Sequence, residues 1–255
     1  MKRWIGVLLL GAMSALGSCR KGAPGAAPDA SAPGEGGPSI RVEGTQVSMN
    51  GEMVGSTRAI QDLGRMQRVD DLFDRLKAAR ETFKMENPGT PFPGRATIAV
   101  PGDTTLLVFK SVFQTAAFAG YPNLLVDASP GLVPIQAIIP GPAAAPSPRV
   151  ALHVGLLASA VTMIEKHGAT VTHQDRVEMP ASDAELGDRV GRAVVDHVLR
   201  RDVRALPVMA VILSMENGLP FAKLAAVLRG LRAAHERLAG PGDEDGAFVV
   251  RLSVR

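Results

Sequence analysis

Apolar and polar positions alternate with two different periods along the chain, and these periods predict strands followed by helices. Residues 39–54 alternate singly around a Gly-Thr pair and an Asn-Gly pair, which is typical of short hairpin strands. Residues 68–83 and 105–119 place apolar side chains three and four positions apart, which is typical of helices that pack on a sheet. The first half therefore reads β-β-α-β-α-β, with its later strands at residues 95–100 and 123–128.

The second half repeats this pattern, although few side chains are identical between the halves. We therefore expect an α+β fold of two tandem lobes, residues 39–128 and 149–255, each a small sheet with two helices (β-β-α-β-α-β). The strands of the second lobe are predicted within residues 149–155, 156–174, 206–216 and 246–254, and its helices at 181–201 and 218–239.

Proline and glycine dominate the segment between the two halves, residues 129–148, and this composition predicts a linker. Its apolar stretch from Leu132 to Ile139 could form an edge strand or pack over one lobe. Pro134 and Pro140 argue against a strand in the middle of a sheet, because proline cannot donate to the hydrogen-bond ladder.

The first 18 residues have the layout of a secretory signal. Lys2 and Arg3 precede a short apolar run that ends in small residues, and the run is too short for a transmembrane helix. Residues 19–38 are rich in Gly, Ala, Pro and Ser, and such a segment buries too little apolar surface to offset the entropy of ordering it. We interpret it as a flexible tether in front of the folded part.

Cys19 is the only cysteine of the chain, and it directly follows Leu16, Gly17 and Ser18. This arrangement resembles the lipobox of bacterial lipoproteins, which implies cleavage before Cys19 and attachment of lipid to its thiol. A lipid anchor would hold the protein on the periplasmic side of the bacterial envelope. The outer membrane is favoured because residue 20 is Arg rather than Asp. A plain signal peptide with an incidental cysteine is the alternative.

Charge and composition argue against a nucleic-acid partner. The chain carries 28 Lys and Arg residues against 25 Asp and Glu, and two of the basic residues lie in the predicted signal. Aromatic residues make up only 4% of the chain, and no dense basic patch contains them. We therefore expect no nucleic-acid binding.

The sequence contains none of the common catalytic or metal-binding motifs, such as G-x-S-x-G, Walker A, H-E-x-x-H or C-x-x-C. We expect no enzyme activity, no cofactor, and no catalytic or metal-ligating residues. His167 and His173 flank a predicted turn and could approach each other, but a third metal ligand would have to come from His153 or Glu165. Surface or core positions are the favoured interpretation for all five histidines, which include His197 and His235.

Three further features have an ordinary structural interpretation that we favour over a functional one. Ser214 ends a predicted strand without a suitably spaced His-Asp pair, and the acidic run at 242–246 lacks the closing Glu of a calcium loop. The two predicted helices of the second half could present a basic face to an anionic partner, but acidic residues interrupt that face. Its basic residues are Arg189, Arg192, Arg200, Arg201, Lys223, Arg229, Arg232 and Arg237.

Residues 95–128 combine a strand, an acidic turn residue, a helix with apolar ridges, an Ala-Gly helix end and an alternating strand. Together with the hairpin pattern at 42–54, this segment resembles the periplasmic domain of the ExbD/TolR biopolymer-transport family. The resemblance covers residues 40–128 well and 149–254 less well, and it implies two tandem domains that could pack as a pseudo-dimer. The residues that carry it are Asp103, Val108, Val112, Ala119, Gly120 and Leu124 to Val126.

The chain departs from that family at its start, because residues 4–18 contain no acidic residue and a proton-driven motor needs an intramembrane carboxylate. The resemblance thus implies a non-enzymatic envelope lipoprotein that binds or scaffolds partners in a biopolymer-transport or envelope-integrity assembly, without its own proton-conducting helix. Protein partners of the cell envelope are expected, with peptidoglycan as a second candidate. The alternative is a lipoprotein enzyme or small-ligand receptor whose site the sequence does not reveal.

Overall fold

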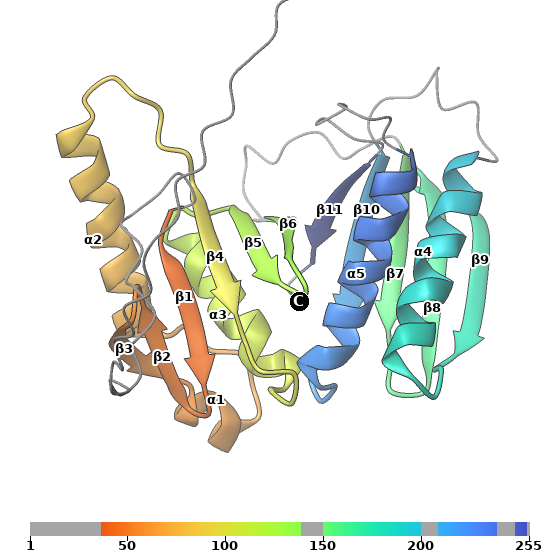
Figure 1. Ribbon diagram of the computed structural model, residues 1–255, viewed down its shortest axis with the longest axis horizontal. Coiled ribbons are helices and arrows are strands. Elements are labelled where there is room, and N and C mark those ends of the chain that lie inside the picture. The colour runs from red at the N-terminus through yellow and green to blue at the C-terminus, as the bar shows by residue number, and fades with distance from the viewer. Residues whose placement is uncertain (1–36, 139–149, 200–208, 239–247, 254–255) are drawn as a thin grey trace, which may run out of the picture. The chain divides into compact units, whose positions relative to one another are not determined.

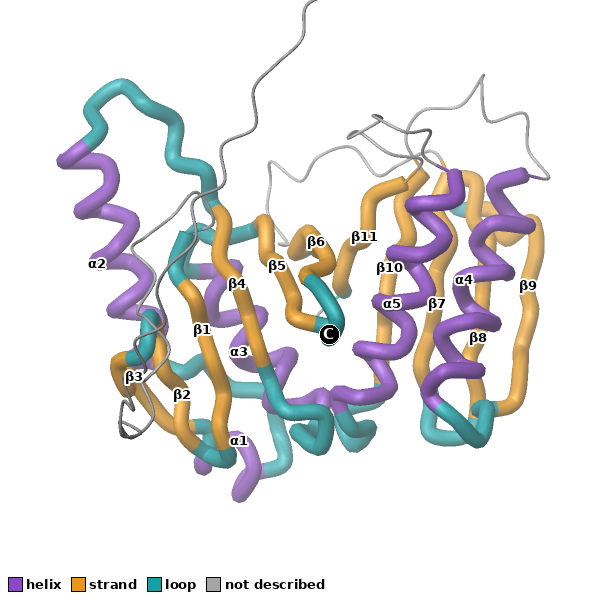
Figure 2. Tube along the Cα trace, viewed as in Figure 1, coloured by secondary structure: helices purple, strands orange, loops and turns teal. Residues whose placement is uncertain are grey.

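The computed structural model describes residues 37–138, 150–199, 209–238 and 248–253 of the chain (Figure 1). Within these ranges the chain alternates between strands and helices as its hydrophobic periods predict (Figure 2). The strands are β1 (Ser39–Glu43), β2 (Gln46–Met49), β3 (Glu52–Ser56), β4 (Arg95–Ala99), β5 (Asn123–Asp127), β6 (Leu132–Ala137), β7 (Val150–Leu156), β8 (Ala160–His167), β9 (Thr170–Glu178), β10 (Met209–Met215) and β11 (Phe248–Leu252). The helices are α1 (Arg58–Leu63), α2 (Asp70–Glu86), α3 (Leu106–Phe118), α4 (Asp183–Leu199) and α5 (Phe221–Leu238).

All of these strands belong to one mixed sheet, in the order β3-β2-β1-β4-β5-β6-β11-β10-β7-β8-β9. In the first half, β1 to β3 form an antiparallel meander. Strand β4 pairs in parallel with β1, and β5 pairs in parallel with β4. The second half repeats this order with β7 to β9 as the meander and β10 and β11 beside β7. Strand β6 stands between the halves, antiparallel to β5 and parallel to β11.

The expected division into two tandem lobes is therefore wrong, because both halves share a single eleven-stranded sheet. Most of the predicted helices and strands lie close to their observed positions, but α1 and the third strand of each meander are additions to the predicted order β-β-α-β-α-β. What the hydrophobic pattern could not indicate is which strand edges meet, because alternation of apolar and polar residues shows which face of a strand is buried and not which strand pairs with its edge. The apolar part of the predicted linker supplies β6, which joins the two halves.

One face of the sheet is buried under the helices and the other is open. Successive side chains of a strand point to opposite faces, so residues paired in register share a face. The row Ile40, Ile98, Val126 and Val133 is buried, and so is the row Leu252, Leu213, Val154 and Met163. Helices α2, α3, α4 and α5 all contribute buried side chains to the same core. The intervening rows are mostly half-buried or exposed, apart from small residues such as Ala151, Gly155 and Ala210.

The first turns of α3 and α5 are joined by reciprocal backbone hydrogen bonds. Leu106 and Leu107 donate their N–H groups to the carbonyls of Leu219 and Asn217, at N···O distances of 2.7 and 3.0 Å. In return, the N–H groups of Phe221 and Ala222 donate to the carbonyls of Thr104 and Gly102, at 2.7 and 2.8 Å. The first N–H groups of a helix lack partners within the helix, and no side chain caps α3, so each half caps the helix of the other.

Buried side chains reinforce this junction. The rings of Phe109 on α3 and Phe221 on α5 pack with their centroids 5.1 Å apart. The ammonium group of Lys110, which is buried, donates to the carbonyl of Met215 at 3.2 Å and to Oδ1 of Asn217 at 2.7 Å. Burial lowers the pKa of Lys110, because the charged form loses hydration. Side-chain and backbone contacts therefore both tie α3 to the second half.

Helices α4 and α5 approach each other through glycines and lie over β10, β7 and β8 (Figure 1). A Cβ atom placed on Gly230 would lie 2.0 Å from the backbone oxygen of Gly187, and one on Gly191 would lie 2.6 Å from the oxygen of Gly230. Backbone atoms cannot move aside as the end of a flexible side chain can. The close approach of the two helices therefore depends on the absence of side chains at these positions.

We expect Gly230→Ala to destabilise the protein by about 1–3 kcal/mol, because the added methyl group overpacks the contact between α4 and α5. Urea unfolding followed by circular dichroism measures this loss. Gly218→Ala is the matched control, since a Cβ atom at Gly218 meets no atom within 4 Å. Equal stability of the two variants would show that the helices are not in the tight contact described here.

Candidate binding groove

Strand β6 pairs with β5 along its whole length but with β11 only at its end. Five residue pairs join β5 to β6, from Asn123 with Gln136 to Asp127 with Leu132. Only Gln136 with Arg251 and Ala137 with Leu252 join β6 to β11. Strands β6 and β11 are therefore unpaired along the first residues of each strand, and the sheet has a gap between them there.

Pro134 explains where this pairing stops. In the parallel register of β6 and β11, the backbone N–H groups of β6 that face β11 belong to alternate residues, and Ile138 donates to Leu252 in this way at 3.2 Å. The donors that precede it toward β11 would be residues 136 and 134. Proline has no N–H group, so residue 134 cannot extend the ladder. The predicted incompatibility of Pro134 with a fully paired central strand is thus visible in the structure: β6 lies inside the sheet but is paired like an edge strand over its first half.

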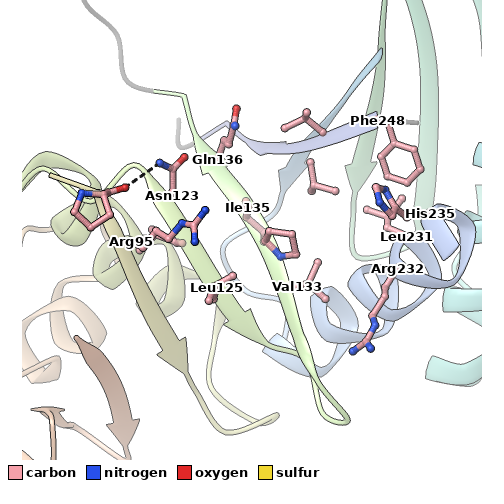
Figure 3. A pocket seen from close by; sticks show the side chains of 15 residues that line it. Arg95, Asn123, Leu125, Val133, Ile135, Gln136, Leu231, Arg232, His235 and Phe248 are labelled. Carbon is pink, nitrogen blue, oxygen red and sulfur yellow. Dashed lines mark hydrogen bonds between the residues drawn. The ribbon is translucent and has the colours of Figure 1, made fainter. Parts of the chain in front are cut away.

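The gap between β6 and β11 forms a groove of about 610 Å³, a size typical of small-molecule sites. Strands β4, β5 and β6 line one side, and α5 and β11 line the other (Figure 3). Most of the lining is apolar, and its apolar residues are Pro93, Leu124, Leu125, Val133, Pro134, Ile135, Leu231, Phe248, Val249 and Val250.

Arginines of α5 hold the turn between β5 and β6 at the mouth of this groove. Arg229 donates through Nη1 to the carbonyls of Ala128 and Ser129, at 2.8 and 3.2 Å. Arg232 lines the groove, donates to the carbonyl of Pro130 at 3.5 Å and pairs with Glu236 at 2.9 Å. These contacts fix α5 relative to β6, so the two walls of the groove keep their separation.

The polar residues of the lining carry hydrogen-bond donors, and no carboxylate is among them. Arg95, Asn123 and Gln136 lie on the side of the strands, and Arg232 and His235 on the side of α5 (Figure 3). The ring of His235 packs edge-on against Phe248, with the ring centroids 5.4 Å apart. The groove is therefore apolar in its body and favours negative charge at its polar positions.

The histidines considered as metal ligands do not converge in the described part of the chain. His167 contacts Glu165 at 3.0 Å, whereas His173 contacts Asp175 at 3.3 Å. His197 of α4 also reaches the buried carboxylate of Glu165, at 2.8 Å. Among the described residues, no group of three or more His, Cys, Asp or Glu side chains is placed to hold a metal ion. Glu165 thus serves as a link between β8 and α4.

The other positions singled out in the sequence have structural surroundings where the structure describes them. Ser214 is exposed on β10, beside Gly155 and Thr162. His153 is half-buried, and burial together with the charge of Lys166 lowers its pKa. Cys19 and residues 242–246 lie outside the described residues. Four basic residues of α4 and α5 pair locally with carboxylates or carbonyls, as on a solvated face: Arg189 with Glu185, Lys223 with Asp183, Arg232 with Glu236, and Arg192 with the carbonyl of Asp188.

Sequence reasoning did not find Arg95, Asn123 and Gln136 as site residues. Their types are common on exposed strands, and they come together only through strand pairing between distant segments. The one usable signal was Pro134, which marks a strand with an unsatisfied edge.

Comparison with known proteins gives no family. No family model and no curated protein matches the chain. The ethanolamine utilization protein EutJ of Carboxydothermus hydrogenoformans is 11% identical over 85% of this chain and 84% of its own, with a TM-score of 0.25. The ROK hexokinase of Thermus thermophilus is 12% identical over 84% and 91%, with a TM-score of 0.28. The Ppx/GppA phosphatase of Aquifex aeolicus is 8% identical over 69% and 66%, with a TM-score of 0.20.

These scores are too low to carry an argument about fold or function, but the comparisons overturn the ExbD/TolR resemblance. No model of that family matches, and the two halves of the chain share one sheet instead of forming two tandem domains. The features that suggested it were an acidic turn residue, apolar helix ridges and an alternating strand. Apolar helix ridges and alternating strands are common wherever a helix connects two strands of a sheet, so they do not distinguish this family. The biopolymer-transport role that depended on the resemblance falls with it.

Proposed function

We propose that this protein is a non-enzymatic envelope lipoprotein that binds an amphipathic ligand in the groove between β6 and β11. The observation that supports binding is the interrupted pairing at Pro134, which leaves a mostly apolar groove of about 610 Å³ inside the sheet. A mostly apolar concavity of this size with a few polar groups at its edge is the usual form of a small-molecule site. The sequence left open a scaffolding lipoprotein and, as the alternative, a lipoprotein enzyme or small-ligand receptor. The groove favours the small-ligand receptor.

Attachment to the envelope rests on the sequence around Cys19. Among the described residues, no helix is long and apolar enough to cross a membrane. In our proposal the lipid on Cys19 is the membrane anchor, and the segment up to residue 38 is the tether that lets the sheet reach its ligand.

Binding of a neutral apolar dye tests directly whether the groove takes an apolar ligand. We expect N-phenyl-1-naphthylamine to bind the purified protein with a rise in fluorescence. Leu125→Trp, which fills the lining, and Pro134→Val, which restores an N–H group toward β11, should each weaken binding about tenfold or more, equivalent to about 1.4 kcal/mol. Pro88→Val is the matched control, because Pro88 is exposed in the turn after α2. Wild-type dye binding by both groove variants would contradict the proposed site.

The anchor is tested separately. We expect the wild-type protein to fractionate with membranes and to carry acyl mass by intact mass spectrometry, and Cys19→Ala to lose both, because only a thiol can take the thioether-linked lipid. A soluble, unmodified wild-type protein would contradict the lipid anchor while leaving the groove untouched.

A further inference from the structure

A row of hydrogen-bond donors crosses four adjacent strands at the polar end of the groove. Arg95 of β4 is paired in register with Asn123 of β5, Asn123 with Gln136 of β6, and Gln136 with Arg251 of β11. Residues paired in this way point to the same face of the sheet. We call these four residues the donor row.

The donor row lies on the open face of the sheet. Arg95, Asn123 and Gln136 are exposed and Arg251 is half-buried. Their neighbours in the strands, Leu124, Ile135, Leu252 and Ala96, are buried on the opposite face among the core residues. A ligand can therefore reach the row from solvent, and three of its four members also line the groove.

The chemistry of the donor row favours an anion. Its two ends are positively charged guanidinium groups, and its middle is two amides with NH₂ donors, of which Asn123 also donates to the carbonyl of Pro93 at 3.5 Å. The nearest carboxylate on the same face of β5 belongs to Asp127, four residues from Asn123. Asp127 already accepts hydrogen bonds from the N–H and hydroxyl groups of Ser129, at 2.9 and 3.0 Å.

Two guanidinium groups on one row match the oxygens of a carboxylate or a phosphate, because each arginine can donate two parallel hydrogen bonds to such a group. An arginine on an open sheet can also simply cover apolar surface with its stem. The donor row differs from that case because Arg95, Asn123 and Gln136 line the apolar groove and Arg251 is paired in register with Gln136. Its position is that of a head-group site beside a site for an apolar chain.

We propose that the donor row binds the oxyanion head group of an amphipathic ligand, a carboxylate or a phosphate, while the apolar part of that ligand lies between β6 and β11. This inference rests on the proposed binding role of the groove. It adds the chemical class of the ligand and two residues, Arg95 and Arg251, as determinants of specificity.

Matched ligands with the same chain and different head groups test the inference. Dodecanoate, dodecyl phosphate and dodecanol are each titrated against bound N-phenyl-1-naphthylamine at pH 8, below the concentrations at which they form micelles. We expect both anions, or the one whose head group fits, to displace the dye at a concentration about tenfold or more below that of dodecanol. The stronger anion then distinguishes a carboxylate ligand from a phosphate ligand.

Variants assign the effect to the donor row. Arg95→Gln and Arg251→Gln should each weaken displacement by the anion about tenfold and leave displacement by dodecanol unchanged, since only the head group loses its partner. Arg41→Gln is the matched control, because Arg41 is exposed on the same open face of β1 and pairs with Glu43 instead.

The outcomes separate the two proposals. If dodecanol displaces the dye as well as both anions do, or if the anions lose nothing in Arg95→Gln and Arg251→Gln, the donor row is not a head-group site and the groove still binds apolar ligands. If the dye binds but none of the three compounds displaces it, the inference about an amphipathic chain is wrong. If the dye itself does not bind the wild-type protein, the groove proposal fails first.

Discussion

The reciprocal backbone hydrogen bonds between the first turns of α3 and α5 are the constraint on which the arrangement of this protein depends. A helix begins with N–H groups that need acceptors, and here the acceptors are carbonyls of the other half. Neither helix can leave the other without exposing two donors of its own and two acceptors that serve its partner. Lys110 and the contact between Phe109 and Phe221 surround this junction with buried side chains.

This junction brings the edges of β5 and β11 close together, and β6 lies between them. Strand β6 comes from a proline-rich stretch. It pairs with β5 along its length but with β11 only at its end. The ladder between β6 and β11 ends before Pro134, which has no N–H group to extend it. Beyond that point the two strand edges lie apart, and apolar residues from both halves face the space between them. The fold thus positions a groove by combining a rigid junction with one incomplete ladder.

Most local structure could be predicted from the sequence because it follows from periods of two and of three to four residues. Residues 105–119 were predicted as a helix, and α3 spans Leu106–Phe118. The assembly of these elements could not be predicted, because the reciprocal bonds involve backbone groups, which every residue carries. Much of the candidate site was likewise hidden, since Arg95, Asn123, Gln136 and Arg251 come from four segments that only strand register aligns. Pro134 was the exception, because proline has the same consequence in any strand.

Residue-resolved amide hydrogen exchange tests the central claim, that the ladder between β6 and β11 ends before Pro134 and leaves a groove. The register places the N–H group of Leu252 in the ladder and that of Val250 beyond its end, facing the groove. The account predicts that the Val250 amide exchanges much faster than the Leu252 amide and becomes protected when N-phenyl-1-naphthylamine is added. Equal protection of both amides in the free protein would show that the two strands pair past Pro134, and would contradict the account.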